Sequence, residues 1–549
     1  MKSRLIRTIG FVFLASIVLS FISPTERYFE IAKNLDIFAT LFKEVNAYYV
    51  DEIEPDKLIR VGIDAMLGSL DPYTNFIPEE EIESFRTLTT GQYAGIGALI
   101  GNINGKIVVT MPYEKFAAHK AGIKIGDELI SIDNVDVKGK SVTQISALLK
   151  GQAKTKVKII ARRYGEADPI TFEFNREKIT IGNVSYAGMI DDQIGYIKLH
   201  DFTPGAGKEV AEALKKLKNE NAGSVVLDLR DNPGGLLSEA VNVSNVFISK
   251  NKEVVSTKGK VVEWNKTYKT LNNPVDTEIP LVVLISGGSA SAAEIVSGVI
   301  QDYDRGVLIG SRTFGKGLVQ TTRPLTYNSQ LKVTTAKYYI PSGRCIQALD
   351  YAHRNEDGSV DRVPDSLKVE FKTKRGRSVY DGGGLDPDLV VKRDYIAPIT
   401  ISLISKGHIF NFSTKFYYEN KERIKTPGFE LSEEDYQGFK DWLQDKEYDY
   451  TTTVEKTLES LESSAKKEKY FDDINQQLMD LKNKVVHNKD SDLENFKTEI
   501  LQVLREEVLS RAFLEKGGIK ASFDSDDDIS KSMAVLMDEA RYNQVLSKK

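Results

Sequence analysis

One serine lies where a buried strand is expected to give way to a helix, among residues too small to block an approaching substrate. The segment follows the apolar stretch 280–285 and reads Gly287-Gly288-Ser289-Ala290-Ser291-Ala292-Ala293-Glu294-Ile295. A helix N-terminus presents unpaired backbone N–H groups and a positive dipole end. Both suit the oxyanion that forms when a serine attacks a carbonyl. The pattern therefore fits a nucleophile, although most turns of this composition only cap a helix.

A lysine between two glycines follows, in the segment Thr313-Phe314-Gly315-Lys316-Gly317-Leu318-Val319-Gln320. A lysine works as a general base only when it is neutral, so its pKa, ordinarily about 10.4, must be lowered, as burial does. Gln320 comes four residues later and would share a face with Lys316 on a strand or a helix, where it could orient the amine. Taken alone, the segment also fits a solvated loop.

A third segment ends a predicted strand in a pair of glycines: Leu227-Asp228-Leu229-Arg230-Asp231-Asn232-Pro233-Gly234-Gly235. Backbone N–H groups at such a turn could complete an oxyanion hole. A plain tight turn is the alternative. Phosphate binding is disfavoured, because no GxxxxGK[ST] pattern occurs in the chain.

Histidine and cysteine usage narrows the chemistry further. The five histidines are scattered, none lies near these segments, and only His200, at the end of a predicted strand, is a rival base for a Ser-His pair. The one cysteine, Cys345, excludes an intrachain disulfide. Without Cys/His ligand spacing we expect no metal site, and the proposed chemistry requires no cofactor.

The composition is that of an ordinary globular protein of several domains. Of 549 residues, 41% are hydrophobic and 28% charged, which excludes a mainly disordered, collagen-like or polytopic membrane chain. The net charge of -5, from 74 basic and 79 acidic residues, offers no basic excess for nucleic acid.

The N-terminus has the layout of an export signal. Lys2, Arg4 and Arg7 precede an uncharged, largely apolar run over 8–23. We expect export to the periplasm or the extracellular side. Removal of the segment and its retention as a membrane anchor both remain open, because no clear small-x-small cleavage site follows.

The remaining elements alternate in type along the chain. Residues 28–87 are predicted to be helical, with a stop at Leu70-Asp71-Pro72 and the acidic first turn of another helix at 79–81, after Pro78. Residues 91–177 form a small β-rich domain with one helix, capped by Ser141 and Gln144. Residues 180–345 alternate strands and helices in an α/β core whose sheet includes 307–309 and 331–336. A polar insert over 350–383 suggests a loop or hairpin.

From about residue 400 the chain is helical and charged. Val454, Leu458 and Leu461 share a face, which favours a helical bundle, with self-association or partner docking as the alternative. We expect the acidic run 525–528 to be a solvated loop.

Over residues 30–390 the chain resembles the carboxyl-terminal processing, or tail-specific, serine peptidases. The resemblance rests on several motifs in order: Ser69-Leu70-Asp71-Pro72-Tyr73, Tyr93-Ala94-Gly95-Ile96-Gly97, the segments 228–235, 287–295 and 315–317, Tyr339-Ile340-Pro341-Ser342-Gly343-Arg344, and Gly384-Leu385-Asp386-Pro387-Asp388. The resemblance implies a Ser–Lys dyad of Ser291 and Lys316, supported by Gln320. It implies oxyanion donors at Ala292 and at Gly234 or Gly235.

The β-rich domain resembles a PDZ domain, most legibly over 121–130. A PDZ domain takes up a peptide C-terminus beside a helix, with loop N–H groups on the carboxylate. The candidate carboxylate loop is Gly95-Ile96-Gly97-Ala98, and the candidate pocket walls are Val142, Ile145 and Leu149. For these three apolar residues, core packing is the alternative.

The resemblance thus implies a multidomain α/β and α+β protein, with a PDZ domain (91–177) inserted ahead of a layered, ClpP/crotonase-like peptidase core (178–398). Helical regions flank them over 24–90 and 399–549, the second outside the minimal family pattern. The expected function is a serine endopeptidase that recognises protein substrates near their C-terminus. The alternatives are a catalytically silent PDZ scaffold and a Ser-His hydrolase of small esters that uses His200.

Overall fold

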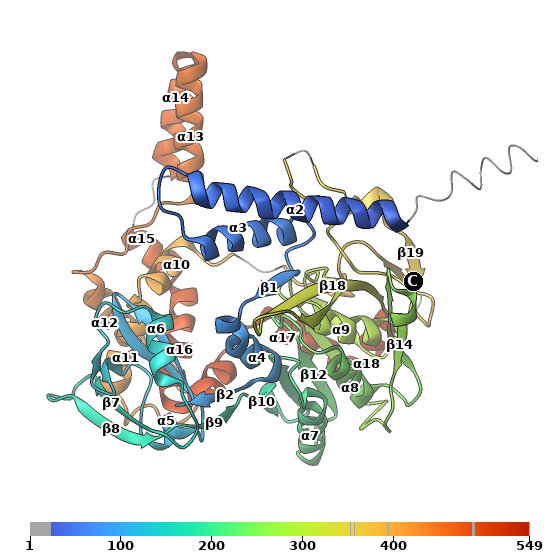
Figure 1. Ribbon diagram of the computed structural model, residues 1–549. Helices are drawn as coiled ribbons and strands as arrows, with labels where there is room; N and C mark the ends of the chain where they lie inside the picture. The colour runs from blue at the N-terminus through green and yellow to red at the C-terminus, as the bar shows by residue number, and fades with distance from the viewer. Residues whose placement is uncertain (1–23, 352, 356, 393–394, 486–488, 548–549) are drawn as a thin grey trace, which may run out of the picture. The chain divides into compact units, whose positions relative to one another are not determined.

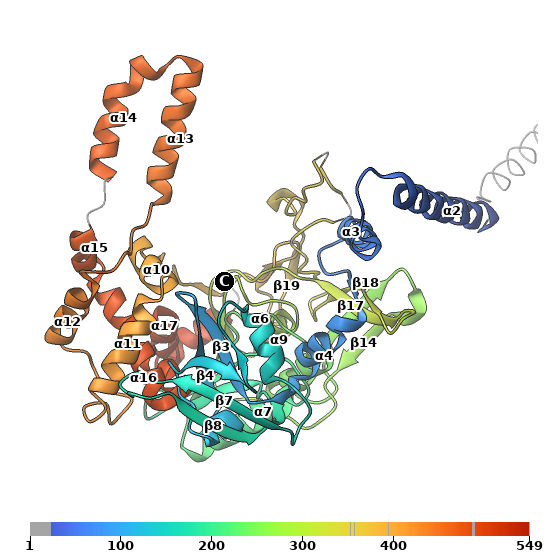
Figure 2. The ribbon, with the colours of Figure 1, turned by 60° about the vertical axis from the view of Figure 1, so that its left-hand side comes forward.

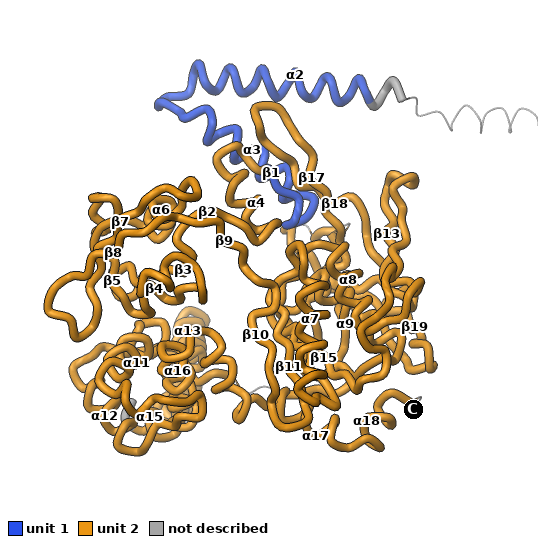
Figure 3. Tube along the Cα trace, turned by 90° about the horizontal axis from the view of Figure 1, so that it is seen from below, with its two compact units in different colours: residues 1–76 blue, residues 77–549 orange. Residues whose placement is uncertain are grey.

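The computed structural model describes residues 24–351, 353–355, 357–392, 395–485 and 489–547. The chain divides into two compact units, 1–76 and 77–549 (Figure 3). The predicted signal or anchor segment, 1–23, lies outside the described residues. Within the described ranges, no helix has both the length and the apolar character that crossing a membrane demands.

Over its described residues, 24–76, the first unit contains two helices, α2 (Pro24–Tyr48) and α3 (Pro55–Gly68) (Figure 1). Helix α3 begins with proline, whose missing N–H costs nothing in the first turn. After it, the Asp71 carboxylate accepts hydrogen bonds from Tyr73 N–H and Thr74 N–H, each at 2.8 Å. This turn confirms the predicted helix stop before Pro72.

The second unit begins with a short helical segment and the β-rich domain. The elements are η1 (Glu79–Glu81), α4 (Ile82–Thr90), β2 (Gln92–Gly95), β3 (Ala98–Ile103), β4 (Lys106–Pro112), α5 (Ala117–Lys120), β5 (Glu128–Ile132), β6 (Val135–Asp136), α6 (Val142–Leu149), β7 (Lys156–Arg162), β8 (Ile170–Asn175) and β9 (Glu177–Thr180). The sheet order is β3-β4-β5-β7-β8, with β6 on β5, while β2 pairs with β9. The predicted capping box is confirmed: Ser141 and Gln144 cap α6 reciprocally.

The α/β core is built on one six-stranded sheet of order β10-β11-β12-β15-β16-β21. Its strands are β10 (Val184–Met189), β11 (Ile194–Leu199), β12 (Ser224–Asp228), β15 (Leu281–Ile285), β16 (Val307–Gly310) and β21 (Leu389–Val390). All neighbours are parallel except β10 and β11. The carboxyl ends of β12 and β15 therefore meet at one edge, which brings the 229–235 and 286–291 loops together.

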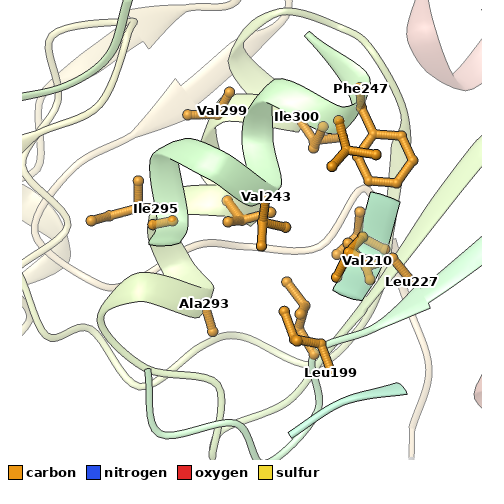
Figure 4. Close-up of a cluster of buried hydrophobic side chains, with 14 of the residues drawn as sticks. Leu199, Val210, Leu227, Val243, Phe247, Ala293, Ile295, Val299 and Ile300 are labelled. Atoms are coloured by element: carbon orange, nitrogen blue, oxygen red, sulfur yellow. The ribbon is translucent and has the colours of Figure 1, made fainter. Parts of the chain in front are cut away.

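Successive side chains along each strand point to opposite faces of this sheet. Both faces are buried, each by its own apolar cluster. Val225 and Leu227 face helices α7 (Ala206–Asn219), α8 (Leu237–Phe247) and α9 (Ala292–Asp302) in one apolar cluster. Figure 4 shows side chains of this cluster, Leu227 among them, packed together. Val226, between them, faces a second cluster that includes Phe523 and Ile529.

A separate sheet lies beside the core. It joins β13 (Glu253–Gly259), β14 (Lys266–Lys269), β17 (Leu318–Pro324) and β18 (Gln330–Tyr339). The expectation that 331–336 continues the main sheet is therefore wrong: these residues pair with β13 and β17 instead. The strand pattern was correct, but periodicity does not reveal which sheet a strand joins. The polar insert contains the short hairpin β19 (Glu370–Lys372) and β20 (Ser378–Tyr380).

The C-terminal region is helical. Its helices are α10 (Pro398–Ser405), α11 (His408–Glu419), α12 (Glu433–Leu443), α13 (Thr453–Glu468), α14 (Phe471–Val485), α15 (Lys489–Asn495), α16 (Lys497–Ala521), α17 (Asp527–Leu536) and α18 (Glu539–Leu546). Helices α10–α12, α15 and α16 share an apolar core, and α13 and α14 run side by side as a hairpin (Figures 1 and 2). Helices α17 and α18 instead complete the second face of the core sheet.

Candidate active site

Ser291 stands at the turn between β15 and α9, with φ 56° and ψ −114°. A non-glycine residue at positive φ is strained and persists only when its surroundings hold it. The side chain is half-buried. The neighbouring Ser289 is fully buried, and its hydroxyl donates to Leu229 O at 2.7 Å. Of the two serines in this segment, Ser289 is therefore structural and Ser291 is the one that stays partly exposed.

A buried carboxylate lies at the centre of the candidate site. Glu294 Oε2 accepts hydrogen bonds from Ser291 N–H at 2.8 Å and Lys316 N–H at 2.9 Å. Its Oε1 accepts from Thr313 Oγ1 at 2.6 Å and Gly315 N–H at 2.8 Å. Burial raises the pKa of Glu294 to about 7, although these four hydrogen bonds lower it. One side chain thus ties the serine turn to the lysine loop.

A tyrosine makes a second link between the same two residues. The buried Tyr338 hydroxyl on β18 lies 2.6 Å from Lys316 O and 3.2 Å from Ser291 O. The hydroxyl therefore donates to the Lys316 carbonyl, and the Ser291 carbonyl lies close by. Lys316 is half-buried. The backbones of Ser291 and Lys316 are accordingly fixed relative to one another through both their N–H and their C=O groups.

The glycine pair of the third segment lies against the serine. A Cβ on Gly234, whose φ is 95°, would come within 2.8 Å of Ala292 N and of Ser291 Cβ, so only glycine fits. The Gly234 N–H donates to Asn232 Oδ1 at 2.8 Å. Asn232 O in turn accepts from Ala290 N–H at 2.9 Å, which joins the two loops. Of the two glycines predicted for the oxyanion hole, Gly234 thus lies beside Ser291 and Ala292, whereas a Cβ on Gly235 would meet Phe202.

Two other predicted residues have different neighbours. Gln320 lies on β17 and donates from Nε2 to Thr334 Oγ1 at 3.1 Å, so its action on Lys316 stays a prediction. The His200 side chain is 60% exposed and lies 3.8 Å from the Asp201 carboxylate.

The predicted PDZ residues separate into core and surface. Ile145 and Leu149 are buried in the domain core at 0% and 4% exposure, so they are packing residues and not open pocket walls. Val142 is only partly buried and lines a groove with residues of α4, β2 and α6, among them Tyr93, Ser146 and Lys150. The apolar periodicity predicts one shared face of α6, and in the structure Ile145 and Leu149 on that face pack into the domain core.

The candidate carboxylate loop joins β2 to β3. Ile96 is buried, and its carbonyl accepts from Ala118 N–H at 2.8 Å, while the Gly97 carbonyl accepts from Tyr113 N–H at 2.9 Å. Both carbonyls are thus turned into the domain. Burial raises the pKa of Tyr93, whose hydroxyl is within reach of the Gly97 N–H.

Sequence reasoning missed two residues of the site, Glu294 and Tyr338. A signal existed for the first, because Ser291-Ala292-Ala293-Glu294 has the spacing of a capping box. For Tyr338 no local pattern pointed inward to the serine, since its contacts come from a strand pairing remote in sequence.

Comparisons with known proteins show which families the chain matches. Residues 193–352 match the family model "Peptidase family S41", 108–163 a "PDZ domain", and 399–536 "Probable PDZ-protease, C-terminal helical domain". A carboxy-terminal-processing protease of Bartonella bacilliformis is 36% identical over 58% of this chain and 73% of its own length. A CtpA-like serine protease of Staphylococcus aureus is 35% identical over 57% of this chain and 62% of its own length.

Among solved structures, a photosystem II D1 C-terminal processing protease is 27% identical, with a TM-score of 0.34, over 65% of this chain and 92% of that one. The core, the site and the PDZ domain together define a serine-type peptidase. The chain belongs to the carboxyl-terminal processing peptidases of family S41.

Proposed function

We propose that this peptidase cleaves protein substrates with a Ser291–Lys316 dyad. The observation that carries the proposal is the shared carboxylate oxygen of Glu294, which holds Ser291 N–H and Lys316 N–H at 2.8 and 2.9 Å. A nucleophile and a base must be held in fixed register for proton transfer, and this link supplies that register.

In the proposed reaction, the Ser291 hydroxyl attacks the scissile carbonyl and its proton passes to the neutral Lys316 amine. Gln320 orients that amine. The tetrahedral oxyanion is held by Ala292 N–H and by a glycine N–H of the 234–235 turn. Gly235 is favoured, because the Gly234 N–H already donates to Asn232. Lys316 then returns the proton to the departing amine, which leaves an acyl-serine. Water hydrolyses this ester through the reverse steps, with water in place of the amine.

Two alternatives make different demands. A Ser-His hydrolase would need the His200 imidazole beside Ser291, whereas that ring is exposed and lies beside Asp201. A silent scaffold would have no use for a strained serine and a buried glutamate with four donors.

We propose further that the PDZ domain selects substrates by their C-terminal residues, which would lie beside α6 near the 95–98 loop. The partial exposure of Val142 along the groove supports this site.

We also propose that the chain acts after export, because three cations precede the apolar run over 8–23. Fractionation of cells with and without a high-salt wash separates a released form from an anchored one.

The experiment is hydrolysis of unstructured peptides with varied C-termini by the full chain. We expect Ser291→Ala and Lys316→Ala each to abolish cleavage, while His200→Ala cleaves normally. Cleavage that survives Lys316→Ala but not His200→Ala would replace the dyad with the Ser-His alternative. Peptide binding without cleavage by the wild type would leave only the scaffold.

A further inference from the structure

Arg230 connects the active-site loop to the C-terminal helices. Its Nε and Nη2 donate to the Asp228 carboxylate at 2.9 and 2.6 Å. Its Nη1 donates to Asp526 at 2.7 Å and to Asp528 at 2.9 Å. The Arg230 side chain is only 10% exposed and that of Asp528 1%, so this ion-pair network is shielded from solvent.

The two carboxylates come from the start of α17. Asp526 is its N-cap and accepts from the N–H groups of Asp528 and Ile529 at 2.9 and 3.1 Å. The expectation of a solvated acidic loop is therefore wrong for Asp526 and Asp528. Asp527 is exposed as expected, but it is the first residue of α17 and does not lie in a loop. Alternate residues of one acidic run thus have opposite environments.

The loop that follows Arg230 is the one that abuts the nucleophile. Asp231 Oδ1 accepts from Ser286 Oγ at 2.8 Å. Asn232 O accepts from Ala290 N–H at 2.9 Å, directly before Ser291. Displacing Arg230 would move the loop that carries Gly234 and Gly235, because these residues adjoin it in a short, tightly bonded stretch.

Charge balance explains why the helices matter to this loop. Arg230 always carries its charge, and a guanidinium has five N–H donors in a planar fork. Asp228 satisfies the Nε edge only. Without Asp526 and Asp528, Nη1 would lose these acceptors in an environment that water hardly reaches.

We infer that Asp526 and Asp528 are positioning residues of the active site, holding the oxyanion loop in its working shape through Arg230. The C-terminal helices are then part of the catalytic apparatus and not only an appendage. This inference rests on the proposed dyad chemistry at Ser291.

The test compares Asp526→Asn, Asp528→Asn and the control Asp527→Asn in the full chain. Asparagine caps helices as well as aspartate does, so Asp526→Asn removes charge while keeping the N-cap of α17. We expect kcat to fall about tenfold or more for Asp528→Asn and severalfold for Asp526→Asn, with KM within about twofold. Asp527→Asn should match the wild type.

A double-mutant cycle separates positioning from general loss of structure. In an Arg230→Gln background, Asp526→Asn should cost no further kcat, because its effect passes through Arg230. Additive losses would overturn the inference. So would wild-type kcat in both Asp526→Asn and Asp528→Asn. Cleavage that persists in Ser291→Ala would instead refute the proposed function, whatever these variants do.

Discussion

Ser291 and Lys316 donate their backbone N–H groups to the same carboxylate oxygen of a buried glutamate, at 2.8 and 2.9 Å. Their carbonyls lie 3.2 and 2.6 Å from one tyrosine hydroxyl. The relative position of the backbones that carry the proposed nucleophile and base is therefore set by the side chains of Glu294 and Tyr338.

Replacing Glu294 by glutamine should cost about a hundredfold in kcat. The glutamine keeps the shape but replaces one oxygen by an NH₂ group, which cannot accept a hydrogen bond. Either Ser291 N–H and Lys316 N–H or the donors of Thr313 and Gly315 then lose their acceptor. Steady-state peptide hydrolysis measures the effect. The matched control is Glu239→Gln, a buried first-turn glutamate of α8 that accepts from Gly207 N–H. Equal losses of kcat in both variants would argue against a special role for Glu294.

Stability should depend on pH through the same carboxyl. Its pKa is about 7 in the folded protein, against an ordinary 4.5, so between these values the folded state binds more protons than the unfolded state. The free energy of unfolding should fall as pH rises from about 4.5 to about 7, and then level off. The loss is about 3 kcal/mol at 1.36 kcal/mol per pKa unit.

Urea unfolding of wild type and Glu294→Gln at several pH values isolates this contribution, because other titrating groups are common to both proteins. The stability difference between them should change only in that window. A difference that stays constant, or moves in favour of the wild type with rising pH, contradicts the assignment.

Tyr338→Phe removes the hydroxyl that faces both carbonyls. We expect a loss of about 1 kcal/mol in stability and a severalfold fall in kcat, because the Lys316 loop loses one of its two links. Tyr339→Phe is the control, since that ring is partly exposed and lies beside the Lys258 amine. Thermal unfolding and hydrolysis assays measure both effects. Tyr338→Phe with wild-type kcat would show that the glutamate link suffices.

The PDZ domain offers a contrast between packing and binding. Ile145→Ala should destabilise the domain by about 2–5 kcal/mol, because the side chain is fully buried. Val142→Ser should leave the domain folded but weaken binding of peptides by their C-termini severalfold. Circular dichroism melting and fluorescence anisotropy separate the two effects. Unchanged peptide affinity in Val142→Ser would move the binding site away from this groove.

Much of the positioning framework follows from local sequence. The apolar run before Ser286 and the small residues after it predicted a strand, a turn and a helix, and β15 and α9 have that order. Ser141 and Gln144 were recognised because a capping box is a contact between neighbours. Such features depend on interactions within a few residues, which a sequence displays directly.

The features that the sequence does not predict depend on contacts between segments that are distant in the chain. The Ser291–Glu294 spacing reads as an ordinary cap until Gly315 and Lys316 approach the same carboxylate. The acidic run at 526–528 looks solvated because its partner, Arg230, is nearly 300 positions away. Hydropathy alone does not distinguish a charge that meets water from one that meets an opposite charge.

The second face of the core sheet has a consequence for biosynthesis. Val226, Val282 and Ile309 are covered by residues beyond 520, which a ribosome supplies more than two hundred residues after the last of these strands. Until that stretch arrives, the sheet keeps an apolar flank bare and Arg230 lacks its two aspartates. Apolar surface that is exposed during synthesis in this way promotes aggregation until the chain is complete.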